Sequence, residues 1–394
     1  MKQGDKNSLP NGWEMKKLGE VCTVIAGQSP EGIYYNSERN GLPFYQGKKE
    51  FRLKYIGEPT CWTSKITKEA EANDILMSVR APVGPVNFAT QKVCIGRGLA
   101  AIRAGKKIDN VYLFNYLLKH ENEIIGNEGA VFNSINKSQI ESIEIPLPPL
   151  EKQQSIVAKL DEAFEAIEKA KANAEQNLKN TKELFDSYLR VIFENKDWKK
   201  VKLSELAIDI TDGDHMPPPK TKTGIPFITI SNINKESFQI DFSETFAVSN
   251  EYYQKLKANR KPQKGDVLYT VTGSYGIPVL IVEDKAFCFQ RHIGLIRPKP
   301  DLISKLLFYW ILSPQAFNQA SEMATGTAQK TVSLSSLRNF SVPKIPPHEQ
   351  QTIVQKLDAL SSETKKLEAN YQKKLEDLEE LKKSILQKAF SGQL

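Results

Sequence analysis

The sequence predicts an α+β protein in which two duplicated, mixed α and β globular domains alternate with two long helices. A stretch near residue 145, IPLPPLEKQQSIVAKLD, returns near residue 342 as VPKIPPHEQQTIVQKLD. Before each copy lie short β-branched and aromatic runs separated by Gly, Pro and Asn, which are typical of strands and turns. After each copy, apolar residues recur at steps of three and four, which is typical of helices that pair. These observations predict one unit of about 190 residues written twice.

The repeat also covers the predicted strands before each proline stretch. The matching strings are GLPF at Gly41 with GIPF at Gly224, DILMSVRAPVG at Asp74 with DVLYTVTGSYG at Asp266, and CIGRGLAAIR at Cys94 with CFQRHIGLIR at Cys288. We therefore divide the chain into a first domain at 1–148, a central helix at 149–195, a second domain at 196–345 and a C-terminal helix at 346–394.

The two helical stretches have matching apolar seams, one from Ile156 to Ile192 and the other from Ile353 to Ile385. Each predicted helix extends over roughly 44 residues, so it would be about 65 Å long. A helix of that length is not stable alone in water, and two copies in one chain can pair antiparallel. The alternative is two amphipathic helices lying on separate globules, and the absence of a helix breaker argues against it.

Composition limits the location and the kind of site. The chain has 394 residues and 40% hydrophobic content, which suffices for buried cores. The longest apolar run, Leu306 to Leu312, is too short to cross a bilayer, and the first residues lack a signal-peptide pattern. The four cysteines show no CxxC spacing. We expect a cytoplasmic protein without a membrane partner, a disulfide framework or a zinc ribbon.

The excess positive charge lies in the globular segments. Residues 1–148 contain 19 basic and 16 acidic side chains, a net charge of +3, and residues 196–347 contain 20 and 14, a net charge of +6. The helical segments 149–195 and 348–394 have net charges of −2 and 0. Two similar basic domains favour a polyanion such as double-stranded DNA, although many soluble domains are as basic as the first.

Polar and aromatic loop residues are the candidates for DNA contact, because Asn, Gln, Arg, Lys and Ser in loops hydrogen-bond base edges, and Lys or Ser can also hold phosphates. In the first copy they are Gln28, Tyr34, Asn36, Gln46, Lys48, Arg80, Arg97 and Asn133. In the second they are His215, Lys220, Asn232, Ser274, Tyr275, Arg291, His292, Gln329 and Lys330. Each could instead be an ordinary solvated residue. Arg97 and Arg291 occupy matching positions, where pairing with a carboxylate is the structural alternative.

Signatures of catalysis are missing from the sequence. We find no Asn-Pro-Pro-Tyr or Asp-Pro-Pro-Tyr string for base methylation, and GLPFYQGKK at Gly41 has the wrong glycine spacing for a phosphate loop. HEQQT at His348 lacks the second histidine of a zinc protease, and the histidines form no ligand-spaced cluster. We expect a recognition protein that has no catalytic residue, metal or cofactor of its own. An unusual nuclease or methyltransferase, and a scaffold without DNA contact, are the competing classes.

The repeated motif, with GTAQKTVSLSSL before its second copy and ILQKAFSGQL at the end, resembles the specificity subunit of Type I restriction-modification systems. The resemblance implies two target recognition domains, each reading half of a bipartite, asymmetric DNA target. It also implies that the helices form a pseudo-twofold antiparallel coiled coil that docks two modification subunits. S-adenosylmethionine, ATP and Mg would then belong to the modification and restriction subunits. Lys330 occupies a commonly basic position of the family, where the first copy has Asn133.

A rigid pair of helices between two DNA-reading domains would act as a ruler, because it would fix the distance between the two half-sites. Removing four residues such as 170–173 from one helix shortens it by about 6 Å, which is close to two base pairs of DNA. The sequence therefore predicts that helix length determines the number of unread bases between the half-sites.

Overall fold

The computed structural model describes residues 9–125, 134–194, 197–216, 218–327 and 329–394. The chain forms two compact units. Unit 1 contains residues 1–174 and 373–394, and unit 2 contains residues 175–372. Both long helices pass from one unit into the other, so each unit is built from one globular domain and half of each helix.

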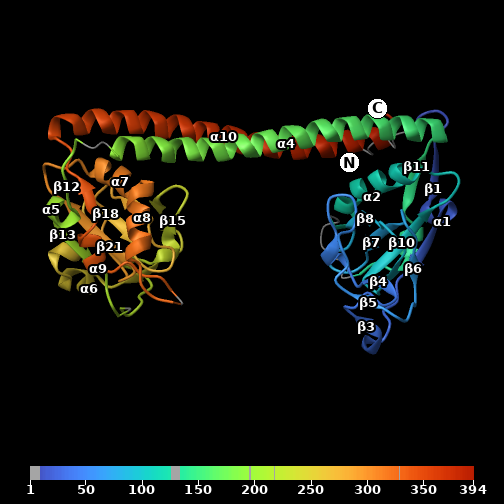
Figure 1. The fold of residues 1–394 in the computed structure, drawn as a ribbon, viewed down its shortest axis with the longest axis horizontal. Helices are drawn as coiled ribbons and strands as arrows, with labels where there is room; N and C mark the ends of the chain where they lie inside the picture. The colour runs from blue at the N-terminus through green and yellow to red at the C-terminus, as the bar shows by residue number, and fades with distance from the viewer. Residues whose placement is uncertain (1–8, 126–133, 195–196, 217, 328) are drawn as a thin grey trace. The chain divides into compact units, whose positions relative to one another are not determined.

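Unit 1 is a mixed α and β domain built around three sheets (Figure 1). Its small sheet pairs β1 (Glu14–Lys17) with β11 (Glu144–Leu147), and its central sheet has the order β2 (Cys22–Ala26), β10 (Leu99–Ala104), β7 (Ile75–Ser78), β8 (Val86–Phe88). The third sheet has the order β3 (Tyr35–Asn36), β5 (Trp62–Thr63), β4 (Leu42–Tyr45), β9 (Val93–Ile95), β6 (Glu69–Ala70). Its helices are α1 (Leu18–Val21), α2 (Asn110–Ile125) and α3 (Lys137–Glu141).

Unit 2 repeats this plan. Its small sheet pairs β12 (Lys200–Lys202) with β22 (Ser341–Pro343), and its central sheet has the order β13 (Ala207–Asp212), β21 (Ile293–Pro298), β18 (Val267–Thr270), β19 (Pro278–Leu280). The other strands are β17 (Phe246–Val248), β14 (Ile225–Ile228) and β20 (Cys288–Phe289) in one sheet, and β15 (Ile233–Asn234) and β16 (Gln239–Ile240) in another. Its helices are α5 (Leu203–Leu206), α6 (Asn250–Lys255), α7 (Ser304–Leu312), α8 (Pro314–Met323) and α9 (Leu334–Arg338).

The two central sheets have the same topology. In both, the first strand pairs antiparallel with the strand before the long domain helix, and that strand pairs antiparallel with the third. Parallel pairing of named strands also recurs among the described residues, between β4 and β9 in unit 1 and between β14 and β20 in unit 2. The sheets therefore confirm the duplication that the sequence predicts.

The long helices are α4 (Leu150–Phe193) and α10 (Pro347–Phe390), each of 44 residues. In unit 1 the first half of α4 pairs with the last half of α10. Ile156 and Leu160 share one core with Leu386 and Phe390. Lys382 pairs with Glu168 at 3.4 Å, and Lys171 pairs with Glu379. Early α4 residues thus meet late α10 residues, as an antiparallel pair requires.

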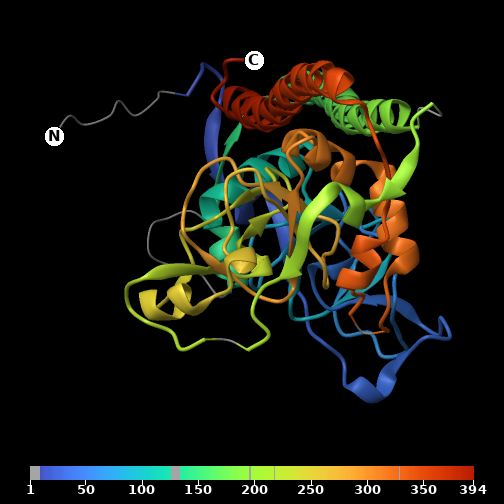
Figure 2. The ribbon, with the colours of Figure 1, turned by 90° about the vertical axis from the view of Figure 1, so that its left-hand side faces the viewer.

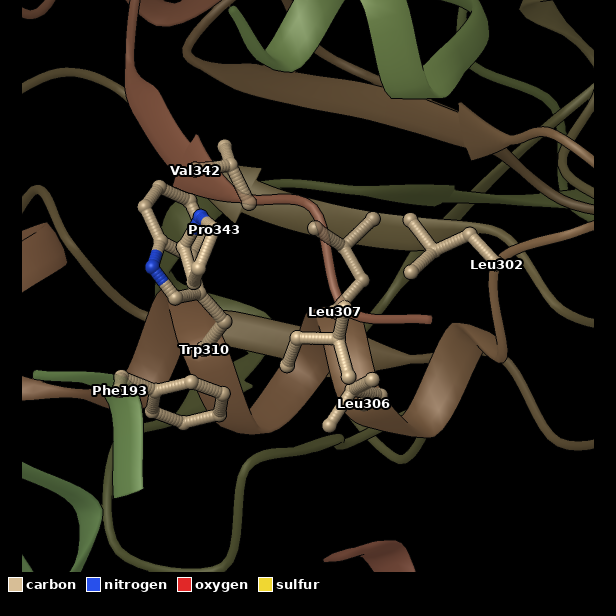
Figure 3. A pocket seen from close by; sticks show the side chains of 8 residues that line it. Phe193, Leu302, Leu306, Leu307, Trp310, Val342 and Pro343 are labelled. Carbon is tan, nitrogen blue, oxygen red and sulfur yellow. The ribbon is translucent and has the colours of Figure 1, made fainter. Parts of the chain in front are cut away.

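In unit 2 the second half of α4 pairs with the first half of α10 (Figure 2). Leu189 and Phe193 of α4 lie in one core with Val354 and Leu357 of α10. This pairing is also antiparallel, so both units confirm the expected coiled coil. Phe193 also borders a small apolar hollow, shown in Figure 3, whose other lining residues are Leu302, Leu306, Leu307, Trp310, Val342, Pro343 and Ile345.

A buried glutamine in each repeated motif fastens the start of a long helix to its domain. The Gln153 side chain accepts from the backbone N–H of Asp109 at 2.7 Å and donates to the carbonyls of Lys107 and Pro148. The Gln350 side chain accepts from Ile303 and donates to Asp301 and Ile345 in the same way. All of the hydrogen-bonding groups of each amide are used except one acceptor lone pair. The repeated QQ string therefore encodes a joint between helix and sheet.

A second repeated element is a bidentate ion pair inside each domain. In unit 1 the Arg103 guanidinium donates to both oxygens of Asp74 at 2.9 and 2.7 Å, and in unit 2 Arg297 donates to Asp266 at the same distances. Each carboxylate also accepts from a nearby backbone N–H. These hydrogen bonds raise the pKa of both arginines. Each pair ties the third strand of the central sheet to the second.

Candidate nucleic-acid interface

The candidate interface is the end of each central sheet that we call the loop end. In unit 1 it contains residues 27–29, 46, 79–84 and 96–98; in unit 2 it contains residues 213–215, 271–276, 290–292, 325–327 and 329–332. The loop end precedes β10 or β21, whereas the residues that hold the long helix follow these strands. A strand of six residues is roughly 20 Å long, so the loop end and the helix joint lie at opposite ends of the domain.

In unit 1 the loop end gathers three of the predicted residues. The Ser29 hydroxyl lies 3.0 Å from Gln46 Oε1 and accepts from the backbone N–H of Arg97 at 3.2 Å. The backbone N–H of Gln28 donates to Ile95 on the same edge. Gln28, Gln46 and Arg97 are all exposed. Unit 1 therefore offers two amides and one guanidinium on a single small surface.

The remaining unit 1 candidates lie at separate places in the domain. Arg80 is exposed on the loop after β7. This loop lies beside the start of β10, because the backbone N–H of Val79 donates to the carbonyl of Gly98. Tyr34 is half-buried, and its ring centroid lies 4.7 Å from the Lys65 ammonium. The side-chain amide of Asn36 donates to the carbonyl of Asn40 and accepts from the N–H of the same residue. Lys48 is exposed in the short 3₁₀ helix Lys48–Glu50. Asn133 lies outside the described residues.

In unit 2 the loop end brings together segments from four parts of the sequence. The backbone N–H of Val271 donates to His292, and Gly273 donates to the carbonyl of Lys330 at 3.0 Å. Arg291 donates to the carbonyl of Asp214 at 2.9 Å. The exposed predicted residues here are His215, Ser274, Arg291, Gln329 and Lys330, with His292 half-buried.

The side chains of three further unit 2 candidates contact neighbouring residues of the domain. The Lys220 ammonium lies 4.7 Å from the Phe246 ring centroid. Tyr275 stacks on Phe317 and its hydroxyl donates to Ser321. Asn232 is buried, and its side-chain carbonyl accepts from the backbone and hydroxyl of Thr229. We therefore assign Asn232 a structural role and leave it out of the interface.

Two arginines and one histidine are among the ionisable groups of the loop ends. Within the described residues, neither the Arg97 nor the Arg291 guanidinium has a carboxylate within 4.0 Å, so the structural pairing considered for them is not found there. Burial, and then the nearby positive charge of Arg291, lower the pKa of His292. Both guanidiniums are thus open to an external anion or to a guanine edge.

Sequence reasoning missed the residues that hold these loops in place. In unit 1 this is Ser29. In unit 2 it is Arg260, whose guanidinium lies 3.2 Å from Asp212 and 3.7 Å from Asp214, together with Tyr252, which donates to Asp214. The described part of the first copy has no ion-pair network that matches that of Arg260, so the repeat carries no signal for it. Ser29 could have been found from its place beside Gln28 in the glycine-bounded loop.

Other kinds of site are not seen. Within the described ranges, no group of three or more His, Cys, Asp or Glu side chains is arranged to hold a metal ion. Across the same residues, no helix combines the length and the apolarity that a membrane crossing demands. The exposed donors and acceptors at the loop ends are suited to binding base edges and phosphates.

Comparison with known proteins matches both halves of the chain to one protein family. The family described as "Type I restriction modification DNA specificity domain" matches residues 10–176 and 195–377. A putative type I restriction enzyme MjaX specificity subunit of Methanocaldococcus jannaschii is 44% identical over 193 residues, which are 48% of this chain and 45% of that protein. The match thus spans less than half the length of that relative. The type I restriction enzyme EcoBI specificity subunit of Escherichia coli is 23% identical over 98% of this chain and 87% of its own length.

Solved structures show the same fold. A chain from a study of complex assembly and conformational transition of the type I R-M system aligns with a TM-score of 0.79 at 21% identity, covering 98% of this chain and all of that one. The HsdS subunit from Thermoanaerobacter tengcongensis aligns with a TM-score of 0.61 at 22% identity, covering 98% of both. The chain therefore belongs to the Type I restriction-modification DNA specificity family, and it contains two specificity domains.

Proposed function

We propose that the chain is the specificity subunit of a Type I restriction-modification complex and that each domain reads one half of a bipartite DNA target through its loop end. The observation that supports this most directly is that the same loop end recurs in both units with different side chains. Unit 1 presents amides and a guanidinium, whereas unit 2 presents histidines, an arginine and a lysine. Because base edges are read by such groups, unlike sets should read unlike half-sites.

The residues divide into base readers and phosphate binders. Gln28, Gln46 and Arg97 in unit 1 can make paired hydrogen bonds with adenine or guanine edges, and Arg291 can do so in unit 2. Lysines are point charges that suit phosphates, so we assign that role to Lys48, Lys220 and Lys330. Arg80, Ser274, Tyr275 and Gln329 border these groups and complete the proposed surface. Tyr34 and Asn36 stay in the proposal as peripheral contacts.

The division of labour follows the four segments 1–148, 149–195, 196–345 and 346–394. We assign reading to the first and third segments, and spacing and the docking of two modification subunits to the helical second and fourth. In this scheme the chain supplies recognition and no catalysis. S-adenosylmethionine is bound by the modification subunits, ATP and Mg by the partner subunits, and the complex acts on DNA in the cytoplasm.

Lys330 provides a test of the phosphate assignment. Its backbone is fixed because its carbonyl accepts from Gly273, while its side chain is exposed. Substitution Lys330→Ala should weaken DNA binding by the assembled complex for all sequences alike. It should also reduce the slope of log K against log salt by about 1, since one phosphate contact is lost. A titration series from low to moderate salt measures this, and an unchanged slope would remove Lys330 from the interface.

The proposed function is tested by single-molecule sequencing of adenine methylation in cells that express this chain with its modification subunit. Control cells express the modification subunit alone. We expect one split, asymmetric motif that depends on this chain. Methylation that is identical without this chain would contradict the assignment. A complex that assembles and methylates without any sequence preference would favour a scaffold.

A further inference from the structure

His215 is held at the loop end of unit 2 by a charged network. Its Nε2 lies 2.9 Å from Asp212 Oδ2, while Asp212 Oδ1 accepts from Arg260 at 3.2 Å. The same guanidinium lies 3.7 Å from Asp214. Asp214, which precedes His215 in the chain, donates to the carbonyl of Phe289 and accepts from the backbone of Arg291. The imidazole is therefore fixed through both its ring and its backbone, yet 59% of its side-chain surface is exposed.

The contact with Asp212 fixes which ring nitrogen carries the proton. A carboxylate that already accepts from a guanidinium can only accept again, so Nε2 of His215 must be the donor. In the neutral ring Nδ1 is then a lone-pair acceptor. No hydrogen-bond partner of Nδ1 lies among the residues that the structure describes. His215 consequently presents an acceptor to whatever faces the loop end.

The neighbouring His292 shows the opposite arrangement. Its Nε2 accepts from Arg291 Nε at 3.3 Å, so its Nδ1 carries the proton. Burial and the charge of Arg291 lower the pKa of this ring and favour the neutral form. Unit 2 therefore places two histidines at one end of the sheet whose neutral rings carry the proton on different nitrogens. Asp212 accounts for the difference, because it contacts His215 and not His292.

We propose that His215 is a specificity-determining residue whose Nδ1, fixed as an acceptor by Asp212, selects an exocyclic amino group in the major groove. This inference rests on the proposed function of unit 2 as a half-site reader and names one contact within it. In the major groove adenine and cytosine carry amino donors at N6 and N4, whereas guanine and thymine carry oxygen acceptors at the corresponding place. An acceptor held in one position thus accepts amino bases and rejects keto bases.

The consequence can be tested without knowing which strand is contacted. Every base pair has one amino and one keto base, so exchanging the two classes moves the amino group across the groove. The changes A to G, A to T, C to T and C to G exchange the class, and so do their complements. The changes A to C and G to T keep it. If a variant complex accepts bases of the other class, and no further bases, at one position of its motif, the contact with the amino group at that position has been lost.

The experiment compares the methylated motif of the wild-type complex with those of complexes that carry Asp212→Asn or His215→Ala. The asparagine amide can donate as well as accept, so in Asp212→Asn the proton of the neutral His215 ring is no longer confined to Nε2. We expect both variants to admit class-exchanged bases at the same position of the same half-site. The preference for the original base should fall about tenfold. The other half-site should stay unchanged.

Asp214→Asn is the matched control, because it alters the same Arg260 network without touching the His215 ring. It should keep the wild-type preference at that position. Relaxation by Asp214→Asn equal to that by Asp212→Asn would overturn the inference, since general loosening of the loop would then explain both. An unchanged split motif in Asp212→Asn and His215→Ala would also overturn it while leaving half-site reading intact. A wild-type complex without any motif would overturn both proposals.

Discussion

Substitution Asp266→Ala is expected to destabilise unit 2 by about 3–5 kcal/mol, the usual cost of removing one partner from a buried ion pair. Asp266 is buried, and the Arg297 side chain that pairs with it is only 16% exposed. Without the carboxylate, the guanidinium would remain at that site with a single described partner, the carbonyl of Lys261. Chemical denaturation of the purified complex, followed by a probe in unit 2, measures the change.

The equivalent substitution in unit 1, Asp74→Ala, is the internal control. Arg103 donates to Asp74 at the same distances as Arg297 donates to Asp266. The Arg103 side chain is 43% exposed, however, so water can replace the lost carboxylate. We expect a smaller loss of about 1–3 kcal/mol. Equal losses in the two units would show that burial of the arginine does not determine the cost of the missing carboxylate.

Shortening both long helices together is expected to shorten the unread part of the target by about two base pairs, because four helical residues span about 6 Å. The ion pairs of unit 1 give the register. Glu168 meets Lys382 and Lys171 meets Glu379, so residues 170–173 of α4 lie opposite residues 377–380 of α10. Deleting both stretches keeps the antiparallel register, and sequencing of methylated adenines gives the new spacer.

A matched variant that lacks only two residues from each helix separates length from packing. Four residues turn a helix by about 400°, which returns the apolar seam to within 40° of its old direction, whereas two residues turn it by about 200°. The two-residue variant should lose the helix pairing and its methylation activity. If the four-residue variant methylates with an unchanged spacer, the helices do not act as a ruler.

The sequence predicts the duplication, the sheets and the helix pair because each depends on patterns that recur along the chain. Strings that match at Asp74 and Asp266 become equivalent strands, and the seam from Ile156 onward becomes a buried face. The bidentate pairs were also open to prediction. Asp74, Asp266, Arg103 and Arg297 stand at equivalent places in the quoted strings, and a pair kept in both copies points to a shared structural contact.

The details of the candidate site depend on contacts between distant segments, which pattern reasoning does not reach. Asn232 was expected at the interface as an exposed amide, but it caps a short turn inside unit 2. Arg260 lies more than 40 residues from the carboxylates that it holds, and no matching ion-pair network occurs among the described residues of the first copy. Whether an amide faces solvent or its own backbone is decided by the tertiary fold, so only its residue type can be read from the sequence.

The joints at Gln153 and Gln350 have a consequence for how such a protein can change. Each joint fastens a helix beyond one end of a strand whose other end carries the loop end. Substitutions among the loops therefore leave the hydrogen bonds of the joint untouched. Under the proposed function, new target sequences can arise by altering one end of a domain while the hydrogen bonds that hold the long helix persist at the other, which makes recognition and the attachment of the helix separately heritable traits of a single chain.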